Sequence, residues 1–197
     1  MTIQNERARG IDVIRAARAL NEKTSQTTFF HFCDPTLAFK DPIHEKLLAL
    51  WRIKAGSRPM PAKSEISPRD LKNFLGDIVI CQRIAQKPSV FVWRLVGTRV
   101  ETVVGNVTGK TFEESAPVER ARLWIECCDL VLDGGQPLRF VGRVHIKDRE
   151  YLFAENFFMP LANDEGEPTF VMGMCRYSPR QIDEEESWKK EIAAISF

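Results

Sequence analysis

The sequence predicts an α+β domain built on a five-stranded antiparallel sheet, with helices on one face and a further helix at each end of the chain. Two strand-like stretches, Ile78–Ile84 and Phe91–Val96, come first, and the second alternates like a strand with two different faces. Helical segments follow, the longest over Val118–Leu132. Three more strand-like stretches then come in a row, separated by polar turns typical of hairpins. Hairpin-joined strands with helices inserted once favour a single antiparallel sheet.

The composition is that of a globular protein without a strongly charged partner. Among 197 residues, 28 Lys and Arg balance 27 Asp and Glu, and 44% of residues are hydrophobic. The formal net charge of +1 gives no electrostatic reason to expect nucleic acid or an anionic membrane as the main partner. Apolar runs are far shorter than a bilayer span, and the polar N-terminus lacks a signal-peptide core. We therefore expect a cytoplasmic protein without membrane insertion.

The N-terminal part is expected to be one helix and a connector. Thr2–Lys23 carries an apolar stripe among arginines, which has to lie against the domain or against a second copy of the chain. Thr24–Pro42, rich in Thr, Phe and Pro, is expected to be irregular. The stripe consists of Ile11, Val13, Ile14, Ala17 and Leu20.

A helical lead-in follows. The apolar spacing predicts a helix over Ile43–Ala55 that ends at Gly56. Three prolines between Gly56 and Pro68 exclude a helix there and favour an extended segment. A cap at Ser67 then predicts a short helix over Pro68–Leu75.

After the second strand, Thr98 and Glu101 predict a capping box at the start of a short helix with Val100, Val103 and Val104 on one face. Gly105 ends that helix. Lys110–Pro117 is expected to be a loop or a single turn, and Gly134 and Gly135 end the long helix. The closing strands are expected at Leu138–Ile146, Glu150–Pro160 and Pro168–Tyr177, and a last helix, with an apolar stripe of Trp188, Ile192 and Ile195, at Gln181–Ile195.

This order divides the chain into four parts. They are an N-terminal helix and connector (1–42), a helical lead-in with a proline-rich segment (43–76), the core domain (77–177) and a C-terminal helix (178–197).

The five cysteines, an odd number without CxxC spacing, do not suggest a zinc site. We expect free and mostly buried thiols. Redox sensing by Cys127 or Cys128 stays open, because it requires an accessible thiol of low pKa. The cysteines are Cys33, Cys81, Cys127, Cys128 and Cys175.

Several short motifs stand in an order that is found in one family. The motifs are Trp51-Arg52, Arg58-Pro59-Met60-Pro61-Ala62-Lys63, Ile66-Ser67-Pro68, Arg94-Leu95-Val96-Gly97-Thr98, the run Gly105 to Lys110, and Phe158-Met159-Pro160-Leu161 before Asp164-Glu165-Gly166. In these motifs, and in its order of strands and helices, the chain resembles the PAS domains, and in particular the bacterial family of short PAS-type proteins, over about Ile43 to Tyr177.

The resemblance implies a sensory or interaction module. PAS domains wrap a five-stranded sheet around a small cavity that faces the helices, and some hold flavin, haem or a metabolite there. They commonly pair through helices that flank the sheet. A homodimer through the flanking helices and an unidentified signalling protein as partner are therefore expected.

Haem and light-sensing flavin are disfavoured, and the identity of any cofactor stays unknown. Haem-binding PAS domains usually place a histidine on the long helix, and Val118–Leu132 contains none. His145 is expected on a strand, while His31 and His44 precede the core. The light-sensing subgroup needs a cysteine in a run ahead of the long helix, from which Gly105–Gly109 departs.

The sequence carries no enzyme motif, since HExxH, P-loop and G-x-S-x-G patterns are missing and no carboxylates form an obvious acid/base pair. We therefore do not expect an enzyme. A small-molecule carrier or a small enzyme on the same scaffold is the alternative, because a fold does not fix a function.

Arg94 stands out as a guanidinium within an otherwise apolar strand. It points to solvent, or it is buried against a carboxylate, because an unpaired buried charge is too costly. Glu155, midway along a later strand, is the expected partner. The other interpretation is that Arg94 faces an acidic ligand or the flanking helix of a partner subunit.

If the sheet encloses a cavity, its lining is expected from apolar residues on the helix-facing sides of strands and helices. The alternative is a filled core, because aromatic residues and methionines suit packing as well as a ligand pocket. The expected lining residues are Trp93, Leu95, Phe112, Trp124, Cys128, Phe140, Phe157, Met172 and Met174.

The sequence thus predicts a stand-alone, cytoplasmic PAS-type signalling module that works by contact with a partner, and it leaves open whether a small ligand modulates that contact. Residues 178–197 leave no room for an output domain after the core, so the output is expected from exposed surfaces.

Overall fold

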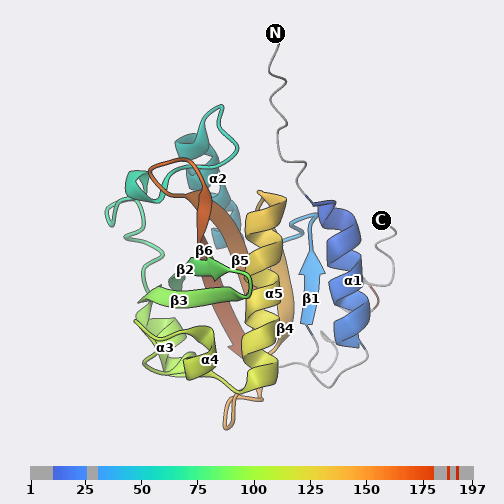
Figure 1. Cartoon of the computed structure of the whole chain (residues 1–197). Coiled ribbons are helices and arrows are strands. Elements are labelled where there is room, and N and C mark those ends of the chain that lie inside the picture. The colour runs from blue at the N-terminus through green and yellow to red at the C-terminus, as the bar shows by residue number, and fades with distance from the viewer. Residues whose placement is uncertain (1–10, 26–30, 180–185, 187–189, 191–197) are drawn as a thin grey trace.

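One antiparallel sheet of six strands forms the centre of the molecule, in the order β1-β4-β5-β6-β2-β3 (Figure 1). This computed structural model describes residues 11–25, 31–179, 186 and 190. The α+β class and the antiparallel sheet are confirmed, and the sheet has one strand more than predicted. The strands are β1 (His31–Asp34), β2 (Ile78–Gln86), β3 (Ser89–Val96), β4 (Leu138–Arg143), β5 (Leu152–Ala162) and β6 (Pro168–Pro179).

Helices cover both faces of the sheet. The longest helix, α5, lies along one face with α3 and α4 beside it, whereas α2 lies behind the opposite face (Figure 1). The core-domain helices α3, α4 and α5 lie on one face, as predicted, and α2 of the lead-in covers the other. None of the helices in the described part of the chain is long and apolar enough to cross a membrane. The helices are α1 (Val13–Ser25), α2 (Ile43–Ala55), the 3-10 turn η1 (Lys63–Glu65), α3 (Thr98–Val104), α4 (Phe112–Ser115) and α5 (Val118–Gly134).

The sheet separates two hydrophobic cores, which we call the α5-side core and the α2-side core. Successive residues of a strand point to opposite faces. Along β6, Val171 and Cys175 therefore belong to the α5-side core, whereas Met172 and Met174 belong to the α2-side core. Both faces are apolar because both are covered.

The sixth strand, β1, lies where the sequence predicted an irregular connector. It pairs with β4 at one edge of the sheet, beside α1 (Figure 1). The side chain of Asn21 on α1 holds it there, because Nδ2 donates to the carbonyl of Cys33 (2.9 Å) and Oδ1 accepts from the amide of Cys33 (2.8 Å). The strand has only four residues and depends on tertiary contacts, so local sequence gave a weak signal for it.

The apolar stripe predicted for the first helix is only half buried. Val13, Ala17 and Leu20 pack into the α5-side core, but Ile11 and Ile14 keep 43% and 49% of their surface exposed. The predicted helical residues Thr2 to Gly10 lie outside the described residues. The same is true of the predicted C-terminal helix apart from Glu186 and Lys190.

The lead-in is as predicted over α2 and differs after it. Trp51 anchors α2, because its buried Nε1 donates to the carbonyl of Pro160 on β5 (2.9 Å). At Ser67 the predicted cap contact forms, with the hydroxyl of Ser67 accepting from the amide of Asp70 (3.3 Å), yet the next residues form tight turns in place of the helix predicted over Pro68–Leu75. Most hydrogen bonds in these turns span three residues rather than the four of an α-helix.

The capping box predicted for Thr98 and Glu101 does not form. Gly97 is the residue before α3, and no side chain caps that end of the helix. A Cβ atom at Gly97 would lie 2.2 Å from the carbonyl oxygen of Leu75. The chain passes so close there because the amide of Gly97 donates to the carbonyl of Ile78 (2.7 Å) and the amide of Arg99 to that of Gly76 (2.8 Å).

We predict that Gly97→Ala lowers the free energy of unfolding by about 2 kcal/mol or more, because an added methyl group has to displace backbone in a packed region. The exposed control Thr98→Ala is expected to change it by less than about 0.5 kcal/mol. Urea unfolding measures both values. A loss of about 1 kcal/mol in Thr98→Ala would instead indicate the capping box.

Candidate functional site

A cavity of about 100 Å³ lies between α5 and the sheet. The sheet side is formed largely by short side chains near its middle, and α3, α4 and the loop after β4 complete the wall. The lining residues are His31, Val79, Cys81, Trp93, Val100, Val103, Val104, Phe112, Arg120, Leu123, Trp124, Cys127, Cys128, Gly142, Arg143, Val144, His145, Ile146, Ala154, Asn156, Phe158, Val171, Cys175 and Tyr177.

The cavity exists on one face of the sheet because of residue size. Cys81, Gly142, Ala154, Val171 and Cys175 face α5 from four neighbouring strands, and none fills the space up to the helix. On the other face the same strands present long side chains that are fully buried. These are Ile78, Phe157, Met159, Leu161, Met172 and Met174.

The structure brings four of the nine predicted lining residues together at this cavity: Trp93, Phe112, Trp124 and Cys128. Phe140 belongs to the α5-side core but does not line the cavity. The other four predicted residues point to the opposite face of the sheet and pack in the α2-side core, away from the cavity. They are Leu95, Phe157, Met172 and Met174.

Three aromatic rings form one rigid wall of the cavity. Phe112 packs against Trp93 with the ring centroids 4.6 Å apart. Trp124 meets Trp93 and Phe112 edge-on, at 5.4 and 5.7 Å. Such contacts fix the rings relative to one another, so this wall is preorganised.

Polar atoms without hydrogen-bond partners interrupt the apolar lining. Among the described residues, Nε1 of Trp93, Nε of Arg120 and Oδ1 of Asn156 are buried and have no partner. Leaving such a group unsatisfied costs about 1–3 kcal/mol. The cavity therefore offers hydrogen-bonding groups that a bound molecule can satisfy.

An imidazole and a thiol meet at the same cavity. Nε2 of His31 lies 3.2 Å from Sγ of Cys127. Burial, with a smaller effect of nearby His145, lowers the pKa of His31 to about 4. Burial raises the pKa of Cys127 well above its usual value. Both groups are therefore neutral at pH 7, and the pair is not the ion pair of a reactive cysteine.

The remaining cysteines have the same character. All five are free and buried, as expected. Burial raises the pKa of Cys175 to about 12 and that of Cys81 well above its usual value. A redox sensor needs the opposite, an accessible thiol of low pKa. Within the described residues, no three His, Cys, Asp or Glu side chains are placed to hold a metal ion.

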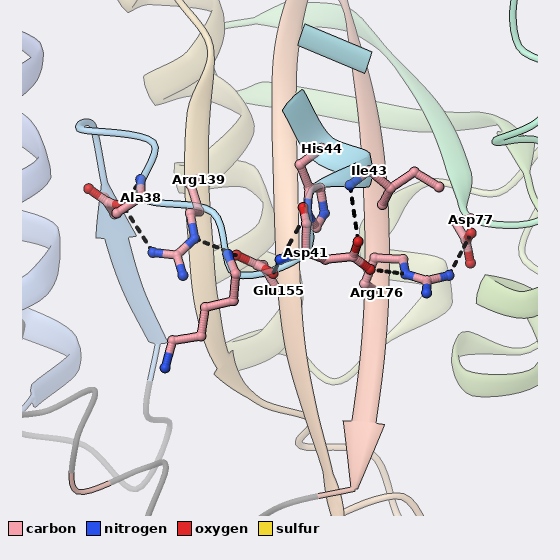
Figure 2. A network of polar contacts seen from close by, with 10 residues as sticks. Ala38, Asp41, Ile43, His44, Asp77, Arg139, Glu155 and Arg176 are labelled. Carbon is pink, nitrogen blue, oxygen red and sulfur yellow. Dashed lines mark hydrogen bonds and ion pairs between the residues drawn. The ribbon is translucent and has the colours of Figure 1, made fainter. Parts of the chain in front are cut away.

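On the other face of the sheet, charged side chains form the network of Figure 2. Arg139 on β4 is buried, and its Nη1 donates to Asp34 (2.9 Å) and its Nε to Glu155 on β5 (2.7 Å). The carboxylate of Glu155 also accepts from the backbone amides of Lys40 (3.0 Å) and Asp41 (3.2 Å).

The ion pair predicted between Arg94 and Glu155 is therefore wrong. Arg94 is exposed, and its Nε donates to the side chain of Gln82 on the neighbouring strand (2.8 Å). Neither Arg94 nor Glu155 lines the cavity between α5 and the sheet.

The network continues toward α3. Arg176 on β6 donates to Asp41 (3.0 Å) and to Asp77 (3.0 Å), and Arg99 binds Asp77 from the other side. Burial raises the pKa of Asp77, but the hydrogen bond from Arg99 and the charges of Arg176 and Arg99 outweigh it and leave that pKa below its usual value. An open hollow of about 370 Å³ beside Arg176 is lined by groups that largely bind one another.

A family model described as PAS domain matches residues 39–176. The chain belongs to the PAS domain family. No curated protein matches the chain. Among solved structures, it is similar to that of an RNA-binding light-oxygen-voltage receptor, with 13% identity and a TM-score of 0.45, over 85% of this chain and 44% of that one. The chain thus spans less than half the length of that receptor.

Membership of the PAS family confirms the resemblance drawn from the motifs, while membership of the short bacterial group stays a prediction. In this PAS domain the sequence did not identify Arg120, Asn156 or His31 as lining residues. A signal existed for Asn156, an amide within the apolar stretch LFAENFFMP, and for Arg120, four residues before Trp124 on a helix.

We predict that Arg139→Ala and Glu155→Ala each lower the free energy of unfolding by about 3–5 kcal/mol, because each leaves a buried charge unpaired. A double-mutant cycle is expected to show coupling of about 1 kcal/mol or more. Arg94→Ala is the exposed control, with a change below about 0.5 kcal/mol. Coupling of Glu155 to Arg94 in place of Arg139 would contradict the assignment.

We predict that the imidazole of His31 stays neutral down to a pH of about 4. Its folded pKa lies below that of an unfolded histidine, so the unfolded state takes up the proton first. Stability from this group is complete above about pH 6.5 and is lost as the pH falls toward 4. NMR titration of the ring protons measures the pKa, and His31→Gln assigns the signal. A midpoint near 6.5 would contradict the burial of this ring.

Proposed function

We propose that this PAS domain is a sensory module whose cavity between α5 and the sheet takes up a small molecule and changes how the protein contacts a signalling partner. The observation that carries the proposal is an apolar cavity of about 100 Å³ with buried, unsatisfied polar atoms on Trp93 and Asn156. A void of this kind weakens the fold when it is empty. A ligand that fills it and makes those hydrogen bonds therefore stabilises the fold.

The size of the cavity limits the ligand. An engineered cavity of about 150 Å³ holds one benzene molecule. A space of about 100 Å³ is smaller than that, so it suits a molecule no larger than about six or seven non-hydrogen atoms, and only once nearby side chains adjust. This is much smaller than haem or flavin, so we propose a small metabolite in their place.

The ligand would touch elements that reach the surface. Val100, Val103 and Val104 line the cavity from α3, and Val144 lines it from the loop after β4. Val103 and Val144 also pack together with Ala154 in a small cluster of their own. A ligand shifts the position of α3 and this loop only if it binds one arrangement more tightly than another. We propose these two segments as the part of the module that responds.

The homodimer through flanking helices also stays a proposal. It is supported by the exposed side chains of Ile14 on α1 and Ile11 just before it, because Val13, Ala17 and Leu20 of the same stripe are already buried within the domain. An amphipathic helix with apolar residues left exposed favours contact with a second protein surface.

We predict that the protein binds benzene with a dissociation constant of about 1 mM, as expected for a ligand of this size in a preformed apolar cavity. Val171→Phe places a ring in the cavity and is expected to weaken binding at least tenfold while the melting temperature stays the same or rises. Val118→Phe, the same substitution at an exposed position of α5, is the control. Isothermal titration calorimetry measures the affinities.

Equal benzene binding by the wild type and Val171→Phe, or no binding by either, would contradict the proposal. Native mass spectrometry of protein purified from its own host supplies the second test, because a resident ligand adds its mass to a folded species. The same spectrum reports whether the protein is a dimer.

A further inference from the structure

The half-buried Arg120 differs from three other arginines of the domain in having no carboxylate of the described residues bound to its guanidinium. Arg83 binds Asp129 and Asp133, Arg139 binds Asp34 and Glu155, and Arg176 binds Asp41 and Asp77. For Arg120 the contact in the described structure is the ring of Trp124, 5.9 Å from its guanidinium carbon. Its Nε is buried and has no hydrogen-bond partner there.

No described carboxylate lines the cavity beside Arg120. The described lining includes Arg120, Arg143, His31 and His145, and neither an aspartate nor a glutamate, while Glu119, the neighbour of Arg120 in the first turn of α5, is exposed outside it. Arg120 is half-buried with its Nε fully buried, and withdrawing part of a cation from water without an anion is costly. Burial accordingly lowers the pKa of Arg120 below its usual value.

The backbone at the start of α5 adds further positive charge near Arg120. Arg120 is in the first turn of α5, a helix of 17 residues. The N-terminal end of a helix carries partial positive charge, which favours anions and disfavours a cation. An anion from outside the chain would therefore be attracted both by the guanidinium of Arg120 and by the N-terminal end of α5.

A second donor lies on the same side of the cavity. Trp124 contacts both Arg120 and Trp93, and the indole Nε1–H of Trp93 has no acceptor among the described residues. Much of the remaining lining is apolar, with Val79, Val100 and Leu123 among its residues, and Asn156 adds a polar group. The site thus combines hydrogen-bond donors and positive charge with an apolar space.

We propose that the ligand of this cavity is a small amphiphilic carboxylate, with its carboxylate on Arg120 and its hydrocarbon part in the apolar space. The proposal rests on the proposed function, since it names the chemical class of the molecule that the cavity takes up. A guanidinium binds a carboxylate through charge-assisted hydrogen bonds, which are about twice as strong as neutral ones.

The test compares pentanoate with pentanamide, which has the same shape and no charge, by isothermal titration calorimetry at pH 7. Wild-type protein is expected to bind pentanoate at least about tenfold more tightly, from the strength of one hydrogen bond to a charged group. Arg120→Gln is expected to remove that preference by weakening pentanoate and leaving pentanamide unchanged. Arg122→Gln, an exposed arginine two residues along the same helix, is expected to keep it.

Two results would overturn the proposal: pentanamide binding as tightly as pentanoate, or a preference for pentanoate that persists in Arg120→Gln. Benzene titrations separate this failure from failure of the proposed function. If benzene binds the wild type and Arg120→Gln, the cavity is intact in both and the carboxylate class alone is wrong. If neither benzene nor pentanoate binds, both proposals are wrong.

Discussion

A sheet covered on both faces is the constraint on which the rest of this structure depends. Because strand residues alternate between the faces, each position belongs either to the α5-side core or to the α2-side core. The α2-side core is filled by large side chains such as Phe157 and Met172, with 0% of their surface exposed. The α5-side face carries short ones, and the cavity follows from that difference in size.

Arg139 and Arg120, on opposite sides of the sheet, differ in whether they are paired with carboxylates of the described residues. On the α2 side, Arg139 is enclosed together with Asp34 and Glu155, and the backbone amides of Lys40 and Asp41, in the connector before α2, complete the set (Figure 2). Each charge there has a partner, so the network ties the segment before α2 to β4 and β5. On the α5 side, the half-buried Arg120 lines the cavity, and no carboxylate is among the described lining residues. Because Arg83, Arg139 and Arg176 each bind carboxylates, this difference is the reason for which we propose a ligand there.

Much of the fold could be predicted from the sequence, because glycines, hairpin turns and the helical spacing of α2 and α5 are local signals. The tight turns after Ser67 and the strand β1 could not. Ser67 and Asp70 make the contacts of a helix cap whether or not a helix follows, and β1 exists only because Asn21 and β4 hold it. At Ser67 the predicted local contacts form without the helix, and at β1 tertiary contacts form a strand where the local sequence predicted an irregular connector.

The site was predictable only in part, for a reason that lies in the strands themselves. In a strand with one exposed face, apolar and polar residues alternate, and the apolar ones identify the inner face. In β5 and β6 both odd and even positions are apolar, because both faces of the sheet are covered. Trp93 and Met172 therefore looked equally suited to the cavity, and only the pairing register separates them. Arg94 illustrates the opposite error, since a lone charge in an apolar strand proved to be exposed.

The indole N–H resonance of Trp93 tests the central claim most directly, because it belongs to an unpartnered donor at the cavity wall. Trp51 provides an internal reference, since its N–H is bound to Pro160 on the opposite side of the sheet. On titration with pentanoate, the account predicts a saturable shift of the Trp93 signal and an unchanged Trp51 signal in a ¹H–¹⁵N spectrum. A Trp93 signal that stays fixed at saturating pentanoate, or that moves only together with Trp51, would contradict it.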